Sequence, residues 1–324
     1  MSRSSAFVRF ALVALSAASP LAHAQGGAPA SIDAASLRFE TGVPSALDVK
    51  RAPTGHLLVR PQVNGHDAGW FIFDTGAGMG VVSTPHVEHL GLTPAGSIDA
   101  VGVGGATGAP LFACETLSIG PVTLAGHTLM GADLSFLKPH LGEEIVGVLG
   151  YDVLSRCVAE IDLADSRIAL HDPASYTLPE GAAWQPLFLE GRVPSIDASF
   201  EGHEGRFRLD TGANGGVTFH EPCVRELGLV EGREVSPAKI GGVGGFVDAR
   251  SGTIEWFELA GVRHERVPAM FAMEPKGTFA DATKAGNIGG EILSRYVLVF
   301  DYPSSRIAFV PRPERKDAGE RPGD

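Results

Sequence analysis

Two aspartates of this chain stand in the same local sequence. Asp74 and Asp210 each begin the tetrapeptide Asp-Thr-Gly-Ala, and each follows a short, largely apolar run. Two carboxyl groups a few ångströms apart cannot both ionise easily, so such a pair holds one proton between its members. One carboxylate can then act as a base toward water while the protonated partner polarises a carbonyl group. The pair therefore predicts attack of water on an amide, with no metal, no cofactor and no covalent intermediate.

The residues that follow each aspartate suit this chemistry. Gly76 and Gly212 permit a sharp turn and leave backbone N–H groups free to reach a carboxylate. Thr75 and Thr211 place a hydroxyl at the same bend. A single Asp-Thr-Gly is more often a turn or a helix N-cap. Two copies with the same apolar lead-in and the same downstream residues favour the catalytic interpretation.

Both tetrapeptides belong to a longer internal repeat. Four further landmarks recur in the same order, with an offset of 136 to 140 residues: 64–66 and 201–203, 88–92 and 225–229, 102–105 and 242–245, and 147–170 and 286–309. Each copy is too long to be one unit of a solenoid. We therefore predict two similar lobes related by a pseudo-twofold axis, an arrangement that brings both aspartates to the interface.

The composition favours a mostly β fold. Glycine (42 residues) and proline (22 residues) are plentiful and aromatic residues are few, which is typical of many short strands joined by tight turns. We expect each lobe to be closed and β-barrel-like, with short helices. The expected division is a signal peptide at 1–24, a leader at 25–46, an N-terminal lobe at 47–172, a linker at 173–190, a C-terminal lobe at 191–311 and a disordered tail at 312–324.

The N-terminus has the layout of a secretory signal peptide. Arg3 and Arg9 precede or flank a short apolar run, and Ala22-His23-Ala24 is typical of a cleavage site. The apolar run is far shorter than the roughly 20 residues that a spanning helix needs. We expect cleavage near Ala24, no stable membrane anchor, and export of the protein to the periplasm or beyond the cell.

Charge and cysteine content narrow the functional classes. The formal net charge of −12 argues against nucleic acid as a partner, because phosphate binding requires a basic surface and no Lys/Arg cluster occurs. Cys114, Cys157 and Cys223 can form at most one disulfide, and we assign none of them a function.

The paired motifs resemble those of the aspartic protease clan. The closest resemblance is to the retropepsin-like bacterial aspartyl proteases, in the two-lobed single-chain arrangement of pepsin, and it runs from about Leu47 to Pro311. It implies an endopeptidase whose catalytic pair is Asp74 and Asp210, supported by the threonine and glycine that follow each aspartate. It also implies a monomer that binds a polypeptide substrate in the cleft between its lobes.

Two glycine loops fall where the flaps of retropepsins lie. They consist of Gly102, Val103, Gly104 and Gly105 in the first lobe and of Gly242, Val243, Gly244 and Gly245 in the second. The resemblance implies loops that open to admit a polypeptide and then close over it, which requires hinge freedom. Neither loop is followed by a convincing helix or a Lys-Ser/Thr pair, which disfavours a nucleotide-binding loop. Plain surface hairpins remain the alternative.

The sequence departs from the resemblance at several points. The apolar-apolar-Gly segment, 148–150 in the first lobe, begins with Asn287 in the second, which leaves open whether the second lobe packs as tightly. Ala77 and Ala213 replace the Ser or Thr of pepsins, which predicts a weakly acidic or neutral pH optimum. The flap tyrosine of pepsins has no counterpart. A peptide-binding or scaffold module with the same fold and no catalysis is the rival hypothesis, although both intact tetrapeptides disfavour it.

Overall fold

The computed structural model describes residues 7–10, 16–17 and 36–312. Most of the predicted signal peptide, the leader up to residue 35 and the tail from residue 313 lie outside these described residues. Within them, no helix is long and apolar enough to cross a membrane.

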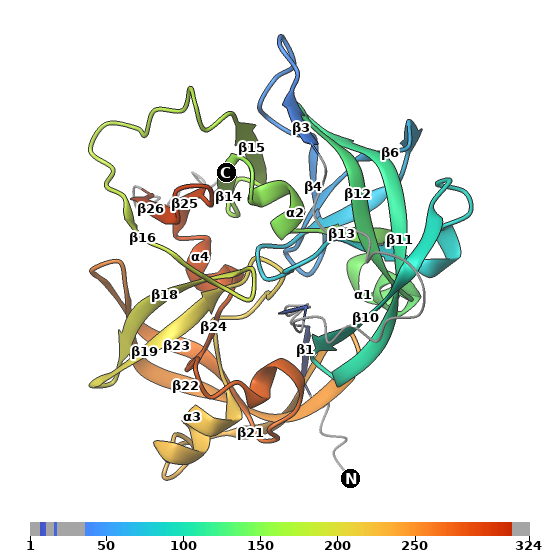
Figure 1. Ribbon diagram of the computed structural model, residues 1–324. Coiled ribbons are helices and arrows are strands. Elements are labelled where there is room, and N and C mark those ends of the chain that lie inside the picture. Colours follow the sequence, from blue (N-terminus) through green and yellow to red (C-terminus); the bar gives the residue numbers. More distant parts are fainter. Residues whose placement is uncertain (1–6, 11–15, 18–35, 313–324) are drawn as a thin grey trace, which may run out of the picture.

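Most of the described strands form two large mixed sheets, one in each lobe (Figure 1). The strand order of the first is β2-β10-β11-β12-β9-β13-β8-β5-β4, and that of the second is β1-β21-β22-β23-β20-β24-β19-β18-β17. The two orders match position by position, so the sequence repeat is also a repeat of topology. The predicted fold class, mostly β with two similar lobes, is confirmed.

The strands of the first lobe are β2 (Ser16–Ala17), β3 (Ser36–Phe39), β4 (Val49–Arg51), β5 (Leu57–Val59), β6 (Gln62–Val63), β7 (His66–Asp67), β8 (Trp70–Phe73), β9 (Val81–Ser83), β10 (Thr93–Gly102), β11 (Gly105–Ile119), β12 (Val122–Ala132) and β13 (Ile145–Leu149). Those of the second are β1 (Phe7–Phe10), β17 (Phe188–Glu190), β18 (Val193–Phe200), β19 (His203–Leu209), β20 (Val217–Phe219), β21 (Ser236–Gly242), β22 (Gly245–Leu259), β23 (Val262–Ala272) and β24 (Gly286–Ile288).

A third sheet joins the lobes. Its order is β15-β14-β25-β26-β16, from β14 (Val158–Asp162), β15 (Arg167–His171), β16 (Gln185–Pro186), β25 (Tyr296–Asp301) and β26 (Arg306–Pro311). Strand β14 of the first half pairs directly with β25 of the second. Backbone hydrogen bonds therefore tie the two lobes together at their base.

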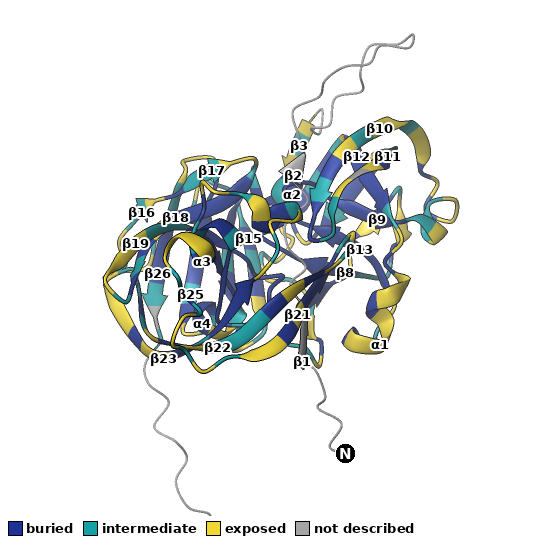
Figure 2. Cartoon of the chain, turned by 90° about the horizontal axis from the view of Figure 1, so that it is seen from below, coloured by how far each residue is buried: buried dark blue, intermediate teal, exposed yellow. Residues whose placement is uncertain are grey.

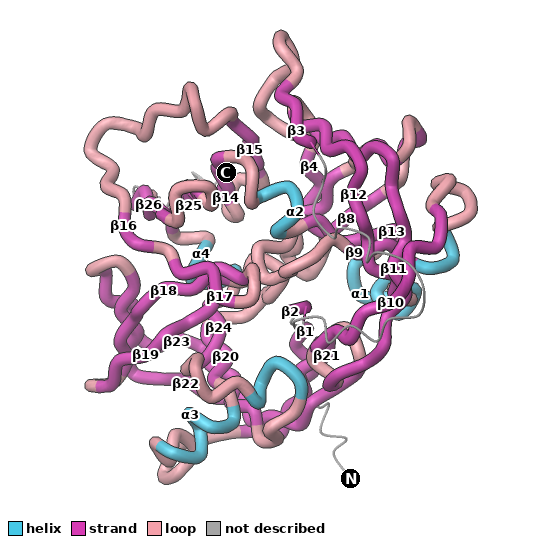
Figure 3. Tube along the Cα trace, in the orientation of Figure 1, coloured by secondary structure: helices cyan, strands magenta, loops and turns pink. Residues whose placement is uncertain are grey.

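The helices are short, as expected, and sit at the ends of strands (Figure 3). They are the 3-10 turns η1 (Thr84–His86), η2 (Ser135–Leu137) and η3 (Gly277–Ala280), and the α-helices α1 (Lys138–Leu141), α2 (Tyr151–Leu154), α3 (Glu221–Glu226) and α4 (Gly290–Leu293). Helices α2 and α4 occupy equivalent places after β13 and β24, which extends the repeat.

Three expected boundary segments form more structure than the sequence suggested. The end of the predicted linker contributes β16 and β17, which pair with β26 and β18. The described part of the leader contributes β3, which pairs with β12 on the first lobe. Arg312, assigned to the tail, forms ion pairs with Asp162 and Asp165. Strand pairing with residues distant in sequence fixes β3 and β16, and local sequence patterns do not reveal such pairing. Strand β17 instead forms a tight hairpin with the neighbouring β18.

The strands that carry the two Asp-Thr-Gly-Ala tetrapeptides lie in the core. Phe71, Ile72 and Phe73 on β8 are almost fully buried, and so are Phe207 and Leu209 on β19. Figure 2 shows buried residues along the inner strands of both lobes and exposed ones on the outer turns. Strand β8 pairs in parallel with β13, and β19 with β24. Each aspartate thus leaves a rigid central strand at a fixed point.

Candidate active site

Both aspartates begin the same backbone turn. The N–H of Asp74 donates to the carbonyl of Leu149 at 2.8 Å, and that of Asp210 donates to Ile288 at 3.0 Å. Three residues on, the N–H groups of Ala77 and Ala213 donate back to the carbonyls of the two aspartates, both at 3.2 Å. The two loops are therefore alike in backbone structure as well as in sequence.

The two threonines cross-link the loops. The Oγ1 of Thr75 donates to the carbonyl of Leu209 at 2.8 Å and accepts the N–H of Thr211 at 3.0 Å. Reciprocally, the Oγ1 of Thr211 donates to the carbonyl of Phe73 at 3.2 Å and accepts the N–H of Thr75 at 3.0 Å. Each hydroxyl thus bonds only the opposite lobe. This exchange, which we call the threonine grip, fixes one loop against the other in a buried setting.

The glycines allow the carboxyl groups to meet. The N–H of Gly76 donates to Oδ1 of Asp74 at 2.7 Å. A Cβ on Gly76 would lie 2.9 Å from Cγ of Asp210, and one on Gly212 would overlap the carboxyl of Asp74. Each glycine therefore packs directly against the aspartate of the other lobe, which leaves no room for a side chain.

Burial and mutual repulsion hold a proton on the pair. Asp74 and Asp210 are only 2 % and 1 % exposed. Burial, followed by the charge of Asp210, raises the pKa of Asp74 well above its usual value. Burial also raises the pKa of Asp210, to about 7, but hydrogen bonding by Asn287 and the charge of Arg208 oppose this rise. At neutral pH the pair therefore keeps a proton, with Asp74 holding it more tightly.

Asn287 is buried and bonded on both sides. The sequence left open whether an amide at this position weakens the packing of the second lobe. The Nδ2 of Asn287 donates to Oδ2 of Asp210 at 3.1 Å, and its Oδ1 lies 2.9 Å from Nε2 of His220. A buried polar group is tolerated when its hydrogen bonds are made. The sequence marked this residue as unusual but gave no sign of its partners.

His56 is a further neighbour that sequence reasoning missed. Its buried ring lies in the first lobe, with Nε2 2.9 Å from the carbonyl of Gly212 and Nδ1 2.7 Å from Oγ1 of Thr54. Burial lowers the pKa of His56 to about 4, so the ring is neutral at weakly acidic pH. It therefore steadies the second loop from across the lobe interface. No sequence signal links residues 56 and 212.

The two glycine loops are the tips of long hairpins, β10–β11 and β21–β22, which we call the flap hairpins. The tips touch, since the N–H of Gly104 donates to the carbonyl of Val243 at 3.2 Å. Val103 is fully buried in a second-lobe cluster that contains Ala213, and Val243 packs against a first-lobe cluster that contains Ala77. Each tip thus crosses to the opposite lobe beside an aspartate loop.

The described residues contain no group of three or more His, Cys, Asp or Glu that could hold a metal ion. All three cysteines are free, and burial raises the pKa of each thiol.

Replacing Thr75 with valine removes one hydroxyl of the threonine grip at nearly constant shape. The carbonyl of Leu209 and the N–H of Thr211 would both lose a buried partner, at about 1–3 kcal/mol each. We expect urea denaturation to give a free energy of unfolding lower by roughly 2–5 kcal/mol. Thr75→Ser, which keeps the hydroxyl, should lose only about 1 kcal/mol. Equal stability of the two variants would contradict the role of the grip.

The raised pKa values predict how stability depends on pH. The folded pair keeps a proton that the unfolded chain, with an aspartate pKa of about 4, has already released. Stability should therefore decline as pH rises from about 4 through 7, the folded pKa of Asp210. Asp74→Asn removes this cost, so its melting temperature should exceed that of the unsubstituted protein by several degrees at pH 8 and converge with it near pH 4. Asp99→Asn, at an exposed position, serves as the control. A difference in melting temperature between Asp74→Asn and the unsubstituted protein that stayed constant with pH would refute the prediction.

Comparison with known proteins assigns the family. A family model described as Aspartyl protease matches residues 59–153 and again 196–291, once in each lobe. No match was found among curated proteins. The two matched segments cover more than half of the chain and contain both aspartate loops. The chain therefore belongs to the aspartyl protease family.

Proposed function

We propose that the protein is an aspartic endopeptidase, which hydrolyses peptide bonds with water activated between Asp74 and Asp210. The observation that carries this proposal is the meeting of two buried carboxyl groups from equivalent loops, with the threonine grip beneath them. No structural requirement of a turn or a cap explains why two carboxyls should face each other in the core, because placing them there costs free energy. Buried carboxyl groups with strongly shifted pKa values are concentrated at functional sites.

In the proposed reaction, the ionised carboxylate takes a proton from water as its oxygen attacks the peptide carbonyl carbon. The protonated carboxyl donates to the carbonyl oxygen, which becomes a hydroxyl of the tetrahedral intermediate. Collapse breaks the C–N bond: the carboxyl that took the proton from water passes it to the leaving nitrogen, and one hydroxyl of the intermediate returns its proton to the other carboxylate as the new C=O forms. Both aspartates come from one chain, so a monomer has a complete site.

The substrate class follows from the flap hairpins. Strand β1 pairs with the edge of β21, and β2 pairs with the edge of β10, so both edges accept extended backbone from elsewhere. Extended peptides bind in this way to open strand edges. We propose a polypeptide substrate held in extended form between the lobes. We also propose that the protein is exported after removal of residues 1–24.

Cleavage of a diverse peptide mixture from pH 3 to 8 tests the activity. Asp74→Asn and Asp210→Asn should each reduce the rate by at least about a hundredfold, because acid–base catalysis needs both groups. Thermal unfolding would verify that the variants fold. A folded, unsubstituted chain that cuts nothing, or an Asp74→Asn variant of full activity, would favour the peptide-binding module instead.

The buried tip of the first flap hairpin predicts a gating effect. Val103→Asp places a charge in the apolar second-lobe cluster, so the tip cannot seat over the pair. We expect kcat/KM to fall at least about tenfold, which corresponds to about 1.4 kcal/mol. The melting temperature should fall by several degrees, because the tip loses the burial of Val103. Ala106→Asp, at an exposed position of the same hairpin, is the matched control. Equal activity of both variants would show that seating of the tip is not needed.

A further inference from the structure

The polar surroundings of the two aspartates differ between the otherwise matched lobes. In the first lobe, β13 places Val148 beside Ile72 of β8; in the second, β24 places Asn287 beside Arg208 of β19. Two apolar side chains are thus replaced by an amide and a guanidinium, next to Asp210 alone. The hydrogen bonds of the Asp74 carboxyl come from backbone N–H groups and from Asp210. The pseudo-symmetry is broken at the pair itself.

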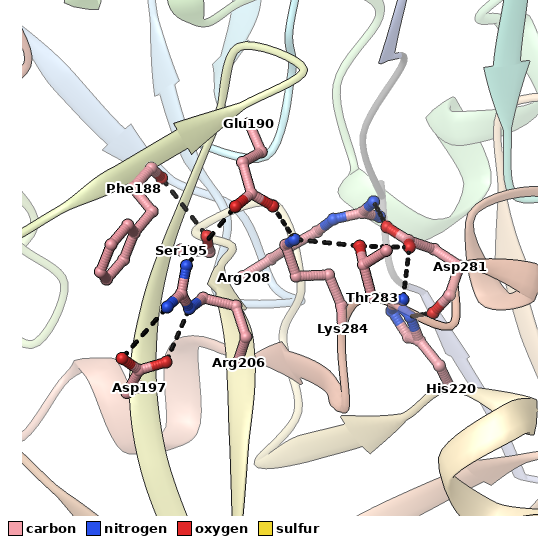
Figure 4. Close-up of polar contacts among 10 residues, drawn as sticks. All are labelled: Phe188, Glu190, Ser195, Asp197, Arg206, Arg208, His220, Asp281, Thr283 and Lys284. Atoms are coloured by element: carbon pink, nitrogen blue, oxygen red, sulfur yellow. Dashed lines mark hydrogen bonds and ion pairs between the residues drawn. The ribbon is translucent and has the colours of Figure 1, made fainter.

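A chain of buried polar groups runs from Asp210 to the edge of the lobe. Asn287 bonds Asp210 and His220, and Nδ1 of His220 lies 3.1 Å from the backbone carbonyl of Asp281. Asn287 and His220 are 1 % and 0 % exposed. Arg208 is anchored by Thr278 and by an ion pair of 2.6 Å with Asp281. Figure 4 shows Arg208 and His220 converging on Asp281.

The chain has two possible directions, and they correspond to opposite charges on Asp210. In one, the amide N–H donates to an ionised Asp210, so Nε2–H of His220 must donate to the amide oxygen. In the other, a protonated Asp210 donates to the amide oxygen, the amide donates to Nε2, and Nδ1–H donates to Asp281. An asparagine side chain can present either end.

Arg208 favours the first direction, in which Asp210 is ionised. Its guanidinium is close enough to favour the charged form of Asp210, whereas Asp74 has no corresponding cation. The other charged groups that act on this region are Asp74, across the lobe interface, Asp281, which pairs with Arg208, and Glu190, whose charge also favours the charged form of Arg208. Burial and the charge of Arg208 lower the pKa of His220 to about 4, so above that pH the neutral ring has one N–H to give. When Asp210 is ionised, that N–H goes to Asn287, and Nδ1 then faces the Asp281 carbonyl without a proton.

We propose that Asn287, oriented by His220, is a positioning residue that donates to Asp210 and makes it the ionised base, leaving the shared proton on Asp74. This inference rests on the proposed function, since it assigns the two roles that the reaction requires. It also explains why the two lobes differ in sequence beside the aspartates, because an acid and a base need different surroundings.

The pH profile of kcat tests this assignment. Asn287→Val gives the second lobe the aliphatic residue type of the first and removes a donor to the carboxylate, so the acid limb should move up by about one pH unit. A downward move would show that the amide oxygen faces a protonated Asp210 and would overturn the proposal. An unmoved limb would overturn it as well. Thr218→Ala, on the neighbouring strand β20, loosens the packing without removing a group of the chain and should leave the limb in place.

Substitution of His220 separates positioning from packing. His220→Phe should shift the limb in the same direction as Asn287→Val, because the amide loses its orienting partner. His220→Gln, whose amide N–H can still donate to Asn287, should restore a profile close to that of the unsubstituted protein. Equal profiles for the two His220 variants would overturn the role assigned to the ring.

Ring nitrogen shifts of His220 in the unsubstituted, ¹⁵N-labelled protein provide a test independent of catalysis and of variant folding. At pH 6 to 7 we expect the Nε2–H tautomer, assigned by the loss of its signals in His220→Gln. The Nδ1–H tautomer would overturn the proposal. If the protein cleaves no peptide but shows the Nε2–H tautomer, the proposed function fails while the direction of the chain stands, so the two failures are distinguishable.

Discussion

The structure depends on the exchange of hydrogen bonds between Thr75 and Thr211. Each hydroxyl accepts an N–H and donates to a carbonyl of the opposite lobe, so four bonds cross the interface at one buried point. Two carboxyl groups repel each other and lose hydration when buried together. The grip, the inter-lobe pairing of β14 with β25, and the glycines that leave space for the carboxyls oppose that repulsion. Without these contacts, the repulsion between the two carboxyl groups would favour separation of the lobes at this point.

This constraint explains why the lobes are alike in some places and different in others. The strand order and the turns that carry the aspartates must match, because each lobe must bring its carboxyl group to the interface in the same way. The neighbours of the carboxyls need not match, since one proton is shared between two groups with different tasks. Asn287, Arg208 and His220 occur on one side only, beside Asp210, the proposed base. The flap hairpins cross reciprocally, so each tip packs beside the aspartate loop of the opposite lobe.

Much of the architecture could be predicted from the sequence, because duplication makes it visible twice. Repeated landmarks predicted two similar lobes, and the two Asp-Thr-Gly-Ala tetrapeptides indicated which carboxyls meet. The partners of Asn287, and the contact of His56 with Gly212, could not be predicted, because each joins residues far apart in sequence with no shared pattern. The pairing of β16 with β26 could not be predicted for the same reason: a turn-rich composition indicates a connector, while long-range strand pairing makes it part of a sheet.

The proposed function requires Asp74 and Asp210 to titrate as one unit with a single shared proton near neutral pH. Carboxyl ¹³C shifts of aspartate-labelled protein, followed from pH 3 to 9, measure this most directly. We expect two linked steps, each visible in both resonances, and a lower apparent pKa of Asp74 once Asp210 is replaced by asparagine, because the repelling charge of Asp210 is gone. Two carboxyls that both ionise below pH 5, each unaffected by the loss of the other, would contradict this expectation.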